Sequence, residues 1–191
     1  TPYAKRMKHQ KEEYDKWKKK QDKAKERGRA YETEMPVTPL EVRYDVPSQM
    51  DPDKNPTIEL PTPIEKIDTG KIHLYEKIDS MWYRAKYQFG SEPGRPRTMK
   101  LVSTWNPGHE YSFEIDSAAF TDIYGKVSKK YKQGIKIPSM DEYSTIVMTL
   151  QNMEGKNCLL QLLNESDKPT KETTAKDGRA TFYYVKPGTY Y

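Results

Sequence analysis

Residues 105–125, WNPGHEYSFEIDSAAFTDIYG, constrain the fold more than any other part of the sequence. Within them Tyr111, Phe113 and Ile115 alternate with polar residues, and this period of two predicts a strand with one buried and one solvated face. The Asn-Pro-Gly sequence before it has turn chemistry, because proline presets φ and glycine accepts a positive φ. A sheet has to cover the buried face of this strand.

Further alternating stretches predict an all-β sandwich over residues 38–138. Prolines recur between residues 36 and 63, which excludes helices there and favours short strands with extended connections. A hairpin is expected at Asp79-Ser80 and a loop at residues 91–96. About seven short strands without an intervening helix are typical of a sandwich. They lie near residues 42–46, 58–60, 72–74, 81–89, 97–105, 111–115 and 133–137.

Residues 139–191 predict a second, smaller set of strands. Residues 139–143 are expected to be a linker. The apolar pattern then predicts strands near residues 146–150, 158–163, 171–174 and 179–185, with a turn at Asp177-Gly178 before the last of them.

Residues 1–30 predict a basic helix. They carry twelve Lys or Arg and five Asp or Glu, and so contribute more positive charge than the net +5 of the whole chain. Their Lys, Glu and Gln content favours a helix that ends at Gly28. We expect residues 1–37 to form an amphipathic helix and a proline-containing linker. A thin stripe of seven-residue spacing, which Gln10 and Gln21 interrupt, consists of Tyr3, Met7, Tyr14, Trp17 and Ala24.

The basic segment raises the alternative that the chain binds nucleic acid or an anionic surface. Clustered Lys and Arg neutralise phosphates and are attracted to anionic membranes. Five acidic residues interrupt the run, however, and no zinc finger or basic zipper accompanies it. A solvated linker helix is the simpler interpretation, and nucleic acid is not the favoured partner.

Composition limits the class of protein. Apolar residues make up 34% and charged residues 32% of the 191 residues, which is polar for a globular chain. Cys158 is the only cysteine, so an intrachain disulfide is excluded, and its apolar neighbours favour a buried structural thiol. No stretch approaches the roughly 20 apolar residues that span a bilayer. We expect the chain to be a piece of a longer protein.

Four short motifs resemble a known family. They are DTGKI at residues 68–72, WNPG at residues 105–108, DSAAF at residues 116–120 and DIYG at residues 122–125. On these motifs, residues 40–137 resemble the bacterial Ig-like domain of surface-layer proteins and, more closely, the Ig-like domain-containing lipoproteins of Bacteroidetes. The resemblance implies an Ig-like β-sandwich in which the last two motifs round the end of the sandwich before its final strand.

Residues 143–191 resemble a different module, the carboxypeptidase-regulatory or prealbumin-like β-sandwich. The resemblance rests on a strand ending in Leu162-Leu163, followed by KDGRATF at residues 176–182 and KPGTY at residues 186–190. The later strands of that family are missing, so the resemblance implies an incomplete second sandwich.

The two resemblances imply a role without catalysis, because neither family supplies catalytic residues. They imply a structural or protein-binding module of a multi-domain lipoprotein in the cell envelope, associated with the outer membrane. Its lipid anchor would lie outside this segment. The implied partners are other envelope proteins, including an outer-membrane protein assembly with this chain as an accessory subunit. No cofactor is implied.

Two patterns typical of enzyme or metal sites have simpler interpretations. The DTG tripeptide at residues 68–70 occurs in aspartic proteases, which need two carboxylates, but no second copy is present and a turn before a strand explains it. Asp51, Asp53 and Asn55 have the spacing of a calcium loop. Proline and threonine stand where that loop needs glycine and glutamate, so a solvated turn is favoured.

The histidines do not suggest a metal or catalytic site. His9, His73 and His109 lie in separate segments without a neighbouring Cys or His at zinc spacing. His109 follows a turn and is expected to be exposed. Ser112 and Asp116 lie near it on the expected outer face of a strand, but no nucleophile elbow supports a hydrolase.

Large aromatic residues give one further alternative, a carbohydrate-binding module. Trp82, Tyr83 and Trp105 would form a stacking platform for sugars if all three lay on the sandwich surface. Aromatic residues in sandwiches are more often part of the core. Together with Trp17 on the helix, these three are the candidate binding residues.

Overall fold

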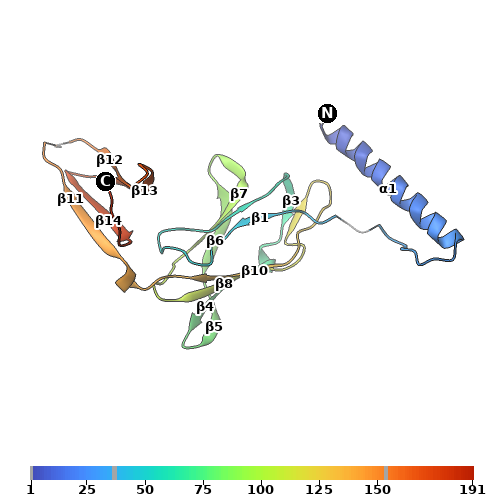
Figure 1. Cartoon of the computed structure of the whole chain (residues 1–191), viewed down its shortest axis with the longest axis horizontal. Coiled ribbons are helices and arrows are strands. Elements are labelled where there is room, and N and C mark those ends of the chain that lie inside the picture. Colours follow the sequence, from blue (N-terminus) through green and yellow to red (C-terminus); the bar gives the residue numbers. More distant parts are fainter. Residues whose placement is uncertain (1, 36–37, 153–154) are drawn as a thin grey trace. The chain divides into compact units, whose positions relative to one another are not determined.

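The computed structural model describes residues 2–35, 38–152 and 155–191. It is mainly β, with 45% of the chain in strands and 16% in helices, as the sequence predicted. Figure 1 shows an N-terminal helix followed by antiparallel strands. The chain divides into two compact units, Thr1–Pro39 and Leu40–Tyr191.

The first unit contains the helix α1 (Pro2–Glu26), which confirms the predicted helix. Gly28 terminates the helix as expected, two residues after its last position, because Gly28 has a φ of 64° and its N–H donates to the Lys25 carbonyl at 3.0 Å. The chain after the helix contacts it again, since Glu32 N–H donates to Gln21 Oε1 at 2.9 Å.

The half-buried side chains of α1 form a narrow stripe that is partly polar. Met7 and Tyr14, two members of the predicted stripe, are 44% and 46% exposed. The side chain of Tyr3 lies outside the described residues. The half-buried positions of the helix include both glutamines that interrupt the predicted stripe; they are Gln10, Trp17, Gln21 and Ala24.

The second unit is built on two four-stranded antiparallel sheets. We call the first the β8 sheet; its order is β10 (Tyr131–Lys136), β8 (Glu110–Ile115), β4 (Ile72–Ile78) and β5 (Met81–Arg84). We call the second the β7 sheet; its order is β1 (Arg43–Asp45), β2 (Thr57–Glu59), β7 (Arg95–Ser103) and β6 (Tyr87–Glu92).

The two sheets share one hydrophobic core, and this arrangement is the predicted sandwich. Ile58 and Leu101 of the β7 sheet are completely buried. From the β8 sheet, Leu74 and Phe113 are 1% and 0% exposed. Each such side chain contributes about 1.5–3 kcal/mol through burial, so the shared core is the main stabilising element of the unit.

Strand β8 lies in the middle of its sheet, between β10 and β4. Tyr111, Phe113 and Ile115 are at most 1% exposed, which confirms the alternation read from the sequence. The turn before β8 contains Gly108 with a φ of 82°, and its N–H donates to the Ile137 carbonyl at 3.0 Å. This bond ties the turn to the chain just after β10.

The single strand predicted over residues 81–89 is wrong, because the structure has two strands there. The chain leaves the β8 sheet after β5 and enters the β7 sheet at β6. At the crossing, Ala85 N–H donates to the Leu74 carbonyl at 2.9 Å. Much of the apolar–polar alternation persists across residues 85–86 because both sheets face one core. The alternation therefore does not reveal the break between β5 and β6. The hairpin at Asp79-Ser80 is confirmed, with φ values of 48° and 69°.

The loop predicted over residues 91–96 is mostly strand. β6 and β7 both extend into it and pair with each other, which leaves a short turn at residues 93–94. Gly94 has a φ of 76°, the conformation that this turn requires. The composition of residues 91–96 indicated a turn but not how far the flanking strands extend.

The alternation pattern misses two short strands, β3 (Ile64–Ile67) and β9 (Phe120–Asp122), which pair antiparallel. Asp122 in β9 is completely buried. Its carboxylate accepts bonds from the Thr62 hydroxyl at 2.9 Å and the Lys126 N–H at 2.8 Å. These bonds satisfy a buried polar group and fix the segment after β8 at the end of the sandwich.

The C-terminal segment contains the further strands that the sequence predicted. β11 (Ser144–Thr149) pairs with β14 (Arg179–Val185), and β12 (Cys158–Leu163) pairs with β13 (Pro169–Ala175). The expected linker contains a short 3-10 helix, η2 (Met140–Glu142). Cys158 is half-buried rather than buried. The small core of this segment consists of Leu162, Phe182 and Val185, with Ile146, Leu160 and Tyr190 packed against it.

Candidate functional site

A groove crosses the outer face of the β8 sheet, and we call it the outer groove. Its volume is about 390 Å³. The pairing places Gly134, Ser112 and Tyr75 side by side on three neighbouring strands. Because side chains alternate along each strand, these positions face outward while their neighbours face the core. The full lining is Tyr75, Trp82, Ser112, Glu114, Lys132 and Gly134.

Two aromatic rings border the outer groove. Trp82 on β5 is 49% exposed, and Tyr75 on β4 is half-buried. Lys77 Nζ lies 5.9 Å from the centroid of the Trp82 ring and 3.0 Å from Glu110 Oε2. A lysine over an indole face that also pairs with a carboxylate restrains the ring. Trp82 is therefore an exposed aromatic surface held in place by its neighbours.

The floor of the groove is polar and ordered. Ser112 is only 5% exposed although it faces outward, and its hydroxyl donates to Glu114 Oε1 at 2.8 Å. Lys132 Nζ lies 2.8 Å from the same oxygen. The bond from Lys132 lowers the pKa of Glu114 below its ordinary value. Burial would raise this pKa, but the bonds from Lys132 and Ser112 together outweigh it. Glu114 is thus an ionised acceptor at neutral pH, with lone pairs for further donors.

Gly134 keeps this floor open. Its φ lies outside the left-handed region, so the backbone does not require glycine. A Cβ atom there would meet only the Tyr111 carbonyl oxygen, at 3.9 Å, which is an ordinary contact. Glycine inside a strand costs roughly 0.5–1 kcal/mol relative to alanine. Neither conformation nor packing explains this cost, and a strand glycine often marks a close approach of another molecule.

The three aromatic residues predicted to form a platform lie in different places. Trp105 is in the core at 4% exposure, where its indole N–H donates to Asn55 Oδ1 at 3.0 Å. Its ring packs edge-on against Tyr111, with 4.9 Å between centroids. Tyr83 lies beside Trp82 on β5 and therefore on the opposite face of the strand. Trp82 alone of the three lines the groove.

Trp17 belongs to the first unit. It is half-buried on α1, with its ring centroid 5.8 Å from that of Tyr14. Among the residues that the structure describes, its buried indole N–H has no hydrogen-bond partner.

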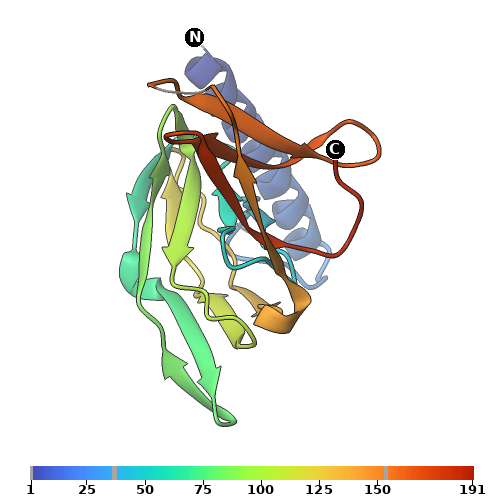
Figure 2. The ribbon, with the colours of Figure 1, turned by 90° about the vertical axis from the view of Figure 1, so that its left-hand side faces the viewer.

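A second exposed surface lies on the other face of the β4–β5 hairpin, and we call it the hairpin patch. It consists of Ile78, Met81 and Tyr83, which are 40%, 61% and 52% exposed. Ile78 pairs with Met81 across the hairpin, so these apolar side chains are adjacent. Figure 2 shows this hairpin extending beyond the neighbouring strands at the bottom of the view. Its core-facing side therefore has no opposing sheet.

A polar cluster connects β4 to the turn before β8. Glu76 Oε1 accepts a bond from Asn106 Nδ2 at 2.7 Å and another from the Tyr111 hydroxyl at 2.9 Å. His109 Nδ1 lies 2.8 Å from the same oxygen, so His109 is not the freely exposed residue that was expected. Burial alone would raise the pKa of Glu76, but these bonds and the His109 charge hold it below its ordinary value. The cluster fixes the turn before β8 against β4.

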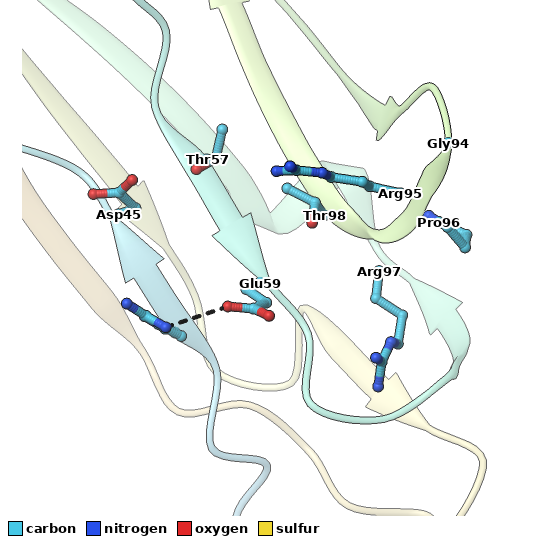
Figure 3. Close-up of a pocket in the computed structure, with 9 residues that line it drawn as sticks. Asp45, Thr57, Glu59, Gly94, Arg95, Pro96, Arg97 and Thr98 are labelled. Carbon is cyan, nitrogen blue, oxygen red and sulfur yellow. Dashed lines mark ion pairs between the residues drawn. The ribbon is translucent and has the colours of Figure 1, made fainter. Parts of the chain in front are cut away.

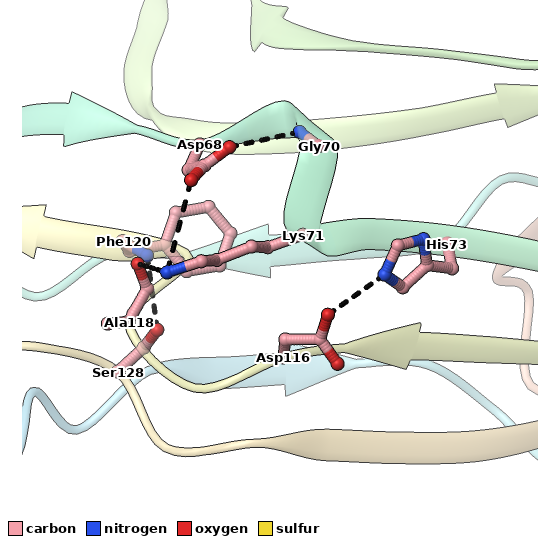
Figure 4. A network of polar contacts seen from close by, with 8 residues as sticks. All are labelled: Asp68, Gly70, Lys71, His73, Asp116, Ala118, Phe120 and Ser128. Atoms are coloured by element: carbon pink, nitrogen blue, oxygen red, sulfur yellow. Dashed lines mark hydrogen bonds and ion pairs between the residues drawn. The ribbon is translucent and has the colours of Figure 1, made fainter.

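The DTG tripeptide forms the predicted turn, shown in Figure 4. Asp68 Oδ1 accepts a bond from Gly70 N–H at 3.2 Å and so caps the 3-10 helix η1 (Thr69–Lys71). Lys71 reaches across to the Ala118 carbonyl at 3.5 Å. The Asp68 carboxylate therefore has a structural role.

Asp51 and Asp53, which have the spacing of a calcium loop, form ion pairs with lysines instead. Asp51 Oδ1 accepts a bond from the Tyr143 hydroxyl at 2.8 Å and lies 2.7 Å from Lys186 Nζ. Asp53 Oδ2 lies 2.6 Å from Lys171 Nζ. These carboxylates connect the sandwich to the C-terminal segment. In the described part of the chain, no group of three His, Cys, Asp or Glu side chains has the arrangement of a metal site.

The residues considered for a catalytic triad are not assembled. Ser112 bonds to Glu114, whereas Asp116 lies 3.0 Å from His73 Nε2 (Figure 4). His109 belongs to the Glu76 cluster. Ser112, Asp116 and His109 thus have different partners and do not form a triad.

A larger pocket of about 480 Å³ lies on the β7 sheet (Figure 3). Arg43 lies 3.5 Å from Glu59, with both side chains more than half exposed. Arg97 donates to the Pro61 carbonyl at 3.2 Å. Exposed pairs of long side chains are weakly held, so the Arg43–Glu59 pair does little to fix the lining of this pocket. Its charged lining consists of Arg43, Arg95, Arg97, Asp45 and Glu59.

Sequence reasoning found Trp82 and the outward position of Ser112 but missed the rest of the outer groove. Glu114 and Gly134 occupy outward positions of predicted strands, whereas Tyr75 and Lys132 lie one residue outside the strands predicted near residues 72–74 and 133–137. What the sequence does not state is which strands are neighbours. Only the pairing of β10, β8 and β4 brings these positions together.

A scan against protein-family models finds no matching family, and a search of curated proteins finds none that is similar in sequence. In the described residues, no helix combines the length and apolar character that crossing a membrane requires. The resemblance to Ig-like envelope lipoproteins therefore stays a prediction. What the structure establishes is a mainly β chain with an N-terminal helix and antiparallel sheets.

Proposed function

We propose that this chain is a non-catalytic protein-binding module of a multi-domain lipoprotein in the bacterial cell envelope. In this proposal it acts as an accessory subunit of an outer-membrane protein assembly, and the lipid anchor lies outside this segment. The hairpin patch is the observation that supports a binding role.

The hairpin patch has the properties of a contact surface. Met81 and Tyr83 are more than half exposed, and Ile78 lies beside them. Adjacent exposed apolar side chains on a projecting element are typical of protein interaction sites. β5 is also the edge strand of its sheet, and an edge strand has backbone groups that can pair with another chain. A partner strand laid along β5 would cover both features at once.

The charged groups of the sandwich favour binding over chemistry. Glu76, Asp68 and Asp116 each contact another side chain or a backbone N–H within the sandwich. A catalytic site needs an acid, a base or a nucleophile directed at a common point. The envelope setting itself rests on the four motifs that resemble Ig-like lipoproteins.

The test is photo-crosslinking of the full-length protein in its native membranes. A crosslinking amino acid replaces Met81 in one sample and Leu159, which is 62% exposed on β12, in the matched control. We expect one envelope protein to be crosslinked from position 81 and not from position 159. A Met81→Ser, Tyr83→Ser double variant should lose this partner on co-purification, whereas Leu159→Ser should keep it.

Three results would contradict the proposal. One is recovery of the protein only in the cytosol. Another is co-purification of nucleic acid without an envelope protein, in a manner that depends on residues 1–30. The last is an envelope partner that the double variant still retains.

A further inference from the structure

The lining of the outer groove suits a ligand with both an apolar face and several polar groups. Trp82 and Tyr75 present ring surface, while Ser112, Glu114 and Lys132 present a hydroxyl, a carboxylate and an ammonium group. Pockets for small molecules are typically aromatic with a few placed polar groups, and occupy roughly 300–1,000 Å³. The 390 Å³ of the groove lies within this range.

The charges of the groove are paired, which argues against a phosphate-rich ligand. Lys132 lies 2.8 Å from Glu114, and Lys77 beside Trp82 lies 3.0 Å from Glu110. Nucleic-acid grooves that stack bases on aromatic rings also need positive charge along the backbone path. Here a carboxylate accompanies each of these two lysines, so an uncharged ligand with many hydroxyl groups fits better.

The missing side chain at Gly134 points to a ligand that reaches the floor of the sheet. Ser112 lies directly opposite Gly134, and a larger residue at position 134 would cover it. The space is open, and the backbone conformation would accept another residue. An aromatic ring beside a clear polar floor suits a flat ring with apolar C–H faces and hydroxyl groups at its edge.

We infer that the outer groove binds a carbohydrate chain, with one sugar ring stacked on Trp82 and the hydroxyl groups of a further ring on Glu114 and Lys132, which lie four residues along β8 from the row of Trp82. Tyr75 lies between these two rows and borders the path of the chain, and the Ser112 hydroxyl lies beneath it. This function goes beyond protein binding at the hairpin patch and does not depend on it, because the two surfaces lie on opposite faces of β5. Since the groove is open to solvent on one side, its affinity for an oligosaccharide will be modest.

The test measures binding of a fixed panel of neutral oligosaccharides to the full chain. The panel contains the hexasaccharides of cellulose, xylan, mannan and chitin, and binding is followed by calorimetry and by Trp fluorescence. Trp82→Ala removes the stacking ring. Tyr83→Ala is the matched control, because Tyr83 has nearly the same exposure on the same strand but faces the other way. Gly134→Val places a side chain on the floor of the outer groove without removing any contact. Gly134→Ala makes the same kind of change with a smaller side chain.

The expected result is binding of at least one panel member, weakened about tenfold or more by Trp82→Ala and by Gly134→Val. Tyr83→Ala should change the affinity less than twofold. The Gly134→Ala variant should melt at the same temperature as the parent or higher and still bind more weakly, which separates loss of the groove from loss of the fold.

The inference is overturned if no panel member binds at millimolar concentration, or if a single-stranded oligonucleotide binds at the groove instead. It is equally overturned if oligosaccharide binding survives both Gly134 variants. If no partner is crosslinked at the hairpin patch while sugar binding is intact, only the proposed function is contradicted, because Met81 and Tyr83 do not line the groove.

Discussion

Replacing Tyr111 by Phe should destabilise the sandwich through one hydroxyl group. Tyr111 is 1% exposed; its hydroxyl donates to Glu76 Oε1 at 2.9 Å and accepts the Asn106 backbone N–H at 2.8 Å. Phe keeps the ring and its packing against Trp105, so no cavity forms. The change removes a hydrogen bond to a charged group, about 1.5–3 kcal/mol, and leaves the part-buried Asn106 N–H unpaired, which costs up to about 1–3 kcal/mol.

These two effects share one site and are not fully additive, so we expect a loss of about 3 kcal/mol in the free energy of unfolding at neutral pH. For a unit of this size, about 3 kcal/mol lowers Tm by roughly 6–12 °C. Urea unfolding followed by circular dichroism measures the loss directly. Tyr83→Phe is the control, because this tyrosine is half exposed, and it should change stability by less than about 0.5 kcal/mol.

The loss should also depend on pH. Burial alone would raise the pKa of Glu76, but the bonds from Asn106 and Tyr111 hold it below its ordinary value of 4.5. A lowered carboxylate pKa stabilises the fold above the ordinary value, and this stabilisation disappears as the pH falls through the folded pKa. The difference between Tyr111→Phe and the parent should therefore shrink in the acid range. A loss below about 0.5 kcal/mol, or one that is equal at neutral and acid pH, would refute the reasoning.

Two further predictions concern other polar groups. Burial raises the pKa of Tyr44 and of Tyr111 to about 12, so the stability that these neutral phenols contribute should be complete below about pH 10 and lost as the pH rises toward 12. Absorbance titration of tyrosinate checks this, and ionisation of all tyrosines together near pH 10 would contradict it. Asp51→Asn should lower the free energy of unfolding of the C-terminal segment by about 0.5–1 kcal/mol, because the ion pair to Lys186 is lost. The loss is small because the Lys186 side chain is half exposed. Faster hydrogen exchange in β14 is the expected readout, and exchange identical to the parent would count against this role of Asp51.

Local patterns were sufficient wherever structure depends on neighbours in sequence. The alternation around Phe113 predicted β8, the Asp79-Ser80 pair predicted the β4–β5 hairpin, and Gly28 predicted the end of α1. These features follow from the pleat of a strand and from backbone conformations that few residues adopt. Strand β9 escaped detection because one of its two buried residues is the polar Asp122, so Phe120–Asp122 shows no apolar alternation.

Local patterns were insufficient where a second element decides the outcome. Trp105 and Trp82 both looked like candidates for a surface platform, but the opposing sheet covers only Trp105. Asp51 and Asp53 had the spacing of a calcium loop, yet they meet lysines more than a hundred residues away, one of them separated by 118 positions. Charge partners at that separation are set by packing of the whole unit and not by spacing in the chain.

The sequence by itself determined the class of the protein: a basic N-terminal helix, a chain of short alternating strands, and turns at positions that few residue types can occupy. Only the tertiary structure decided which strands are neighbours, and thereby placed Gly134, Ser112 and Tyr75 in one row. The physical reason is that alternation specifies which face of a strand is apolar, whereas strand order depends on how two whole sheets bury one core. The outer groove exists because of that second, non-local choice.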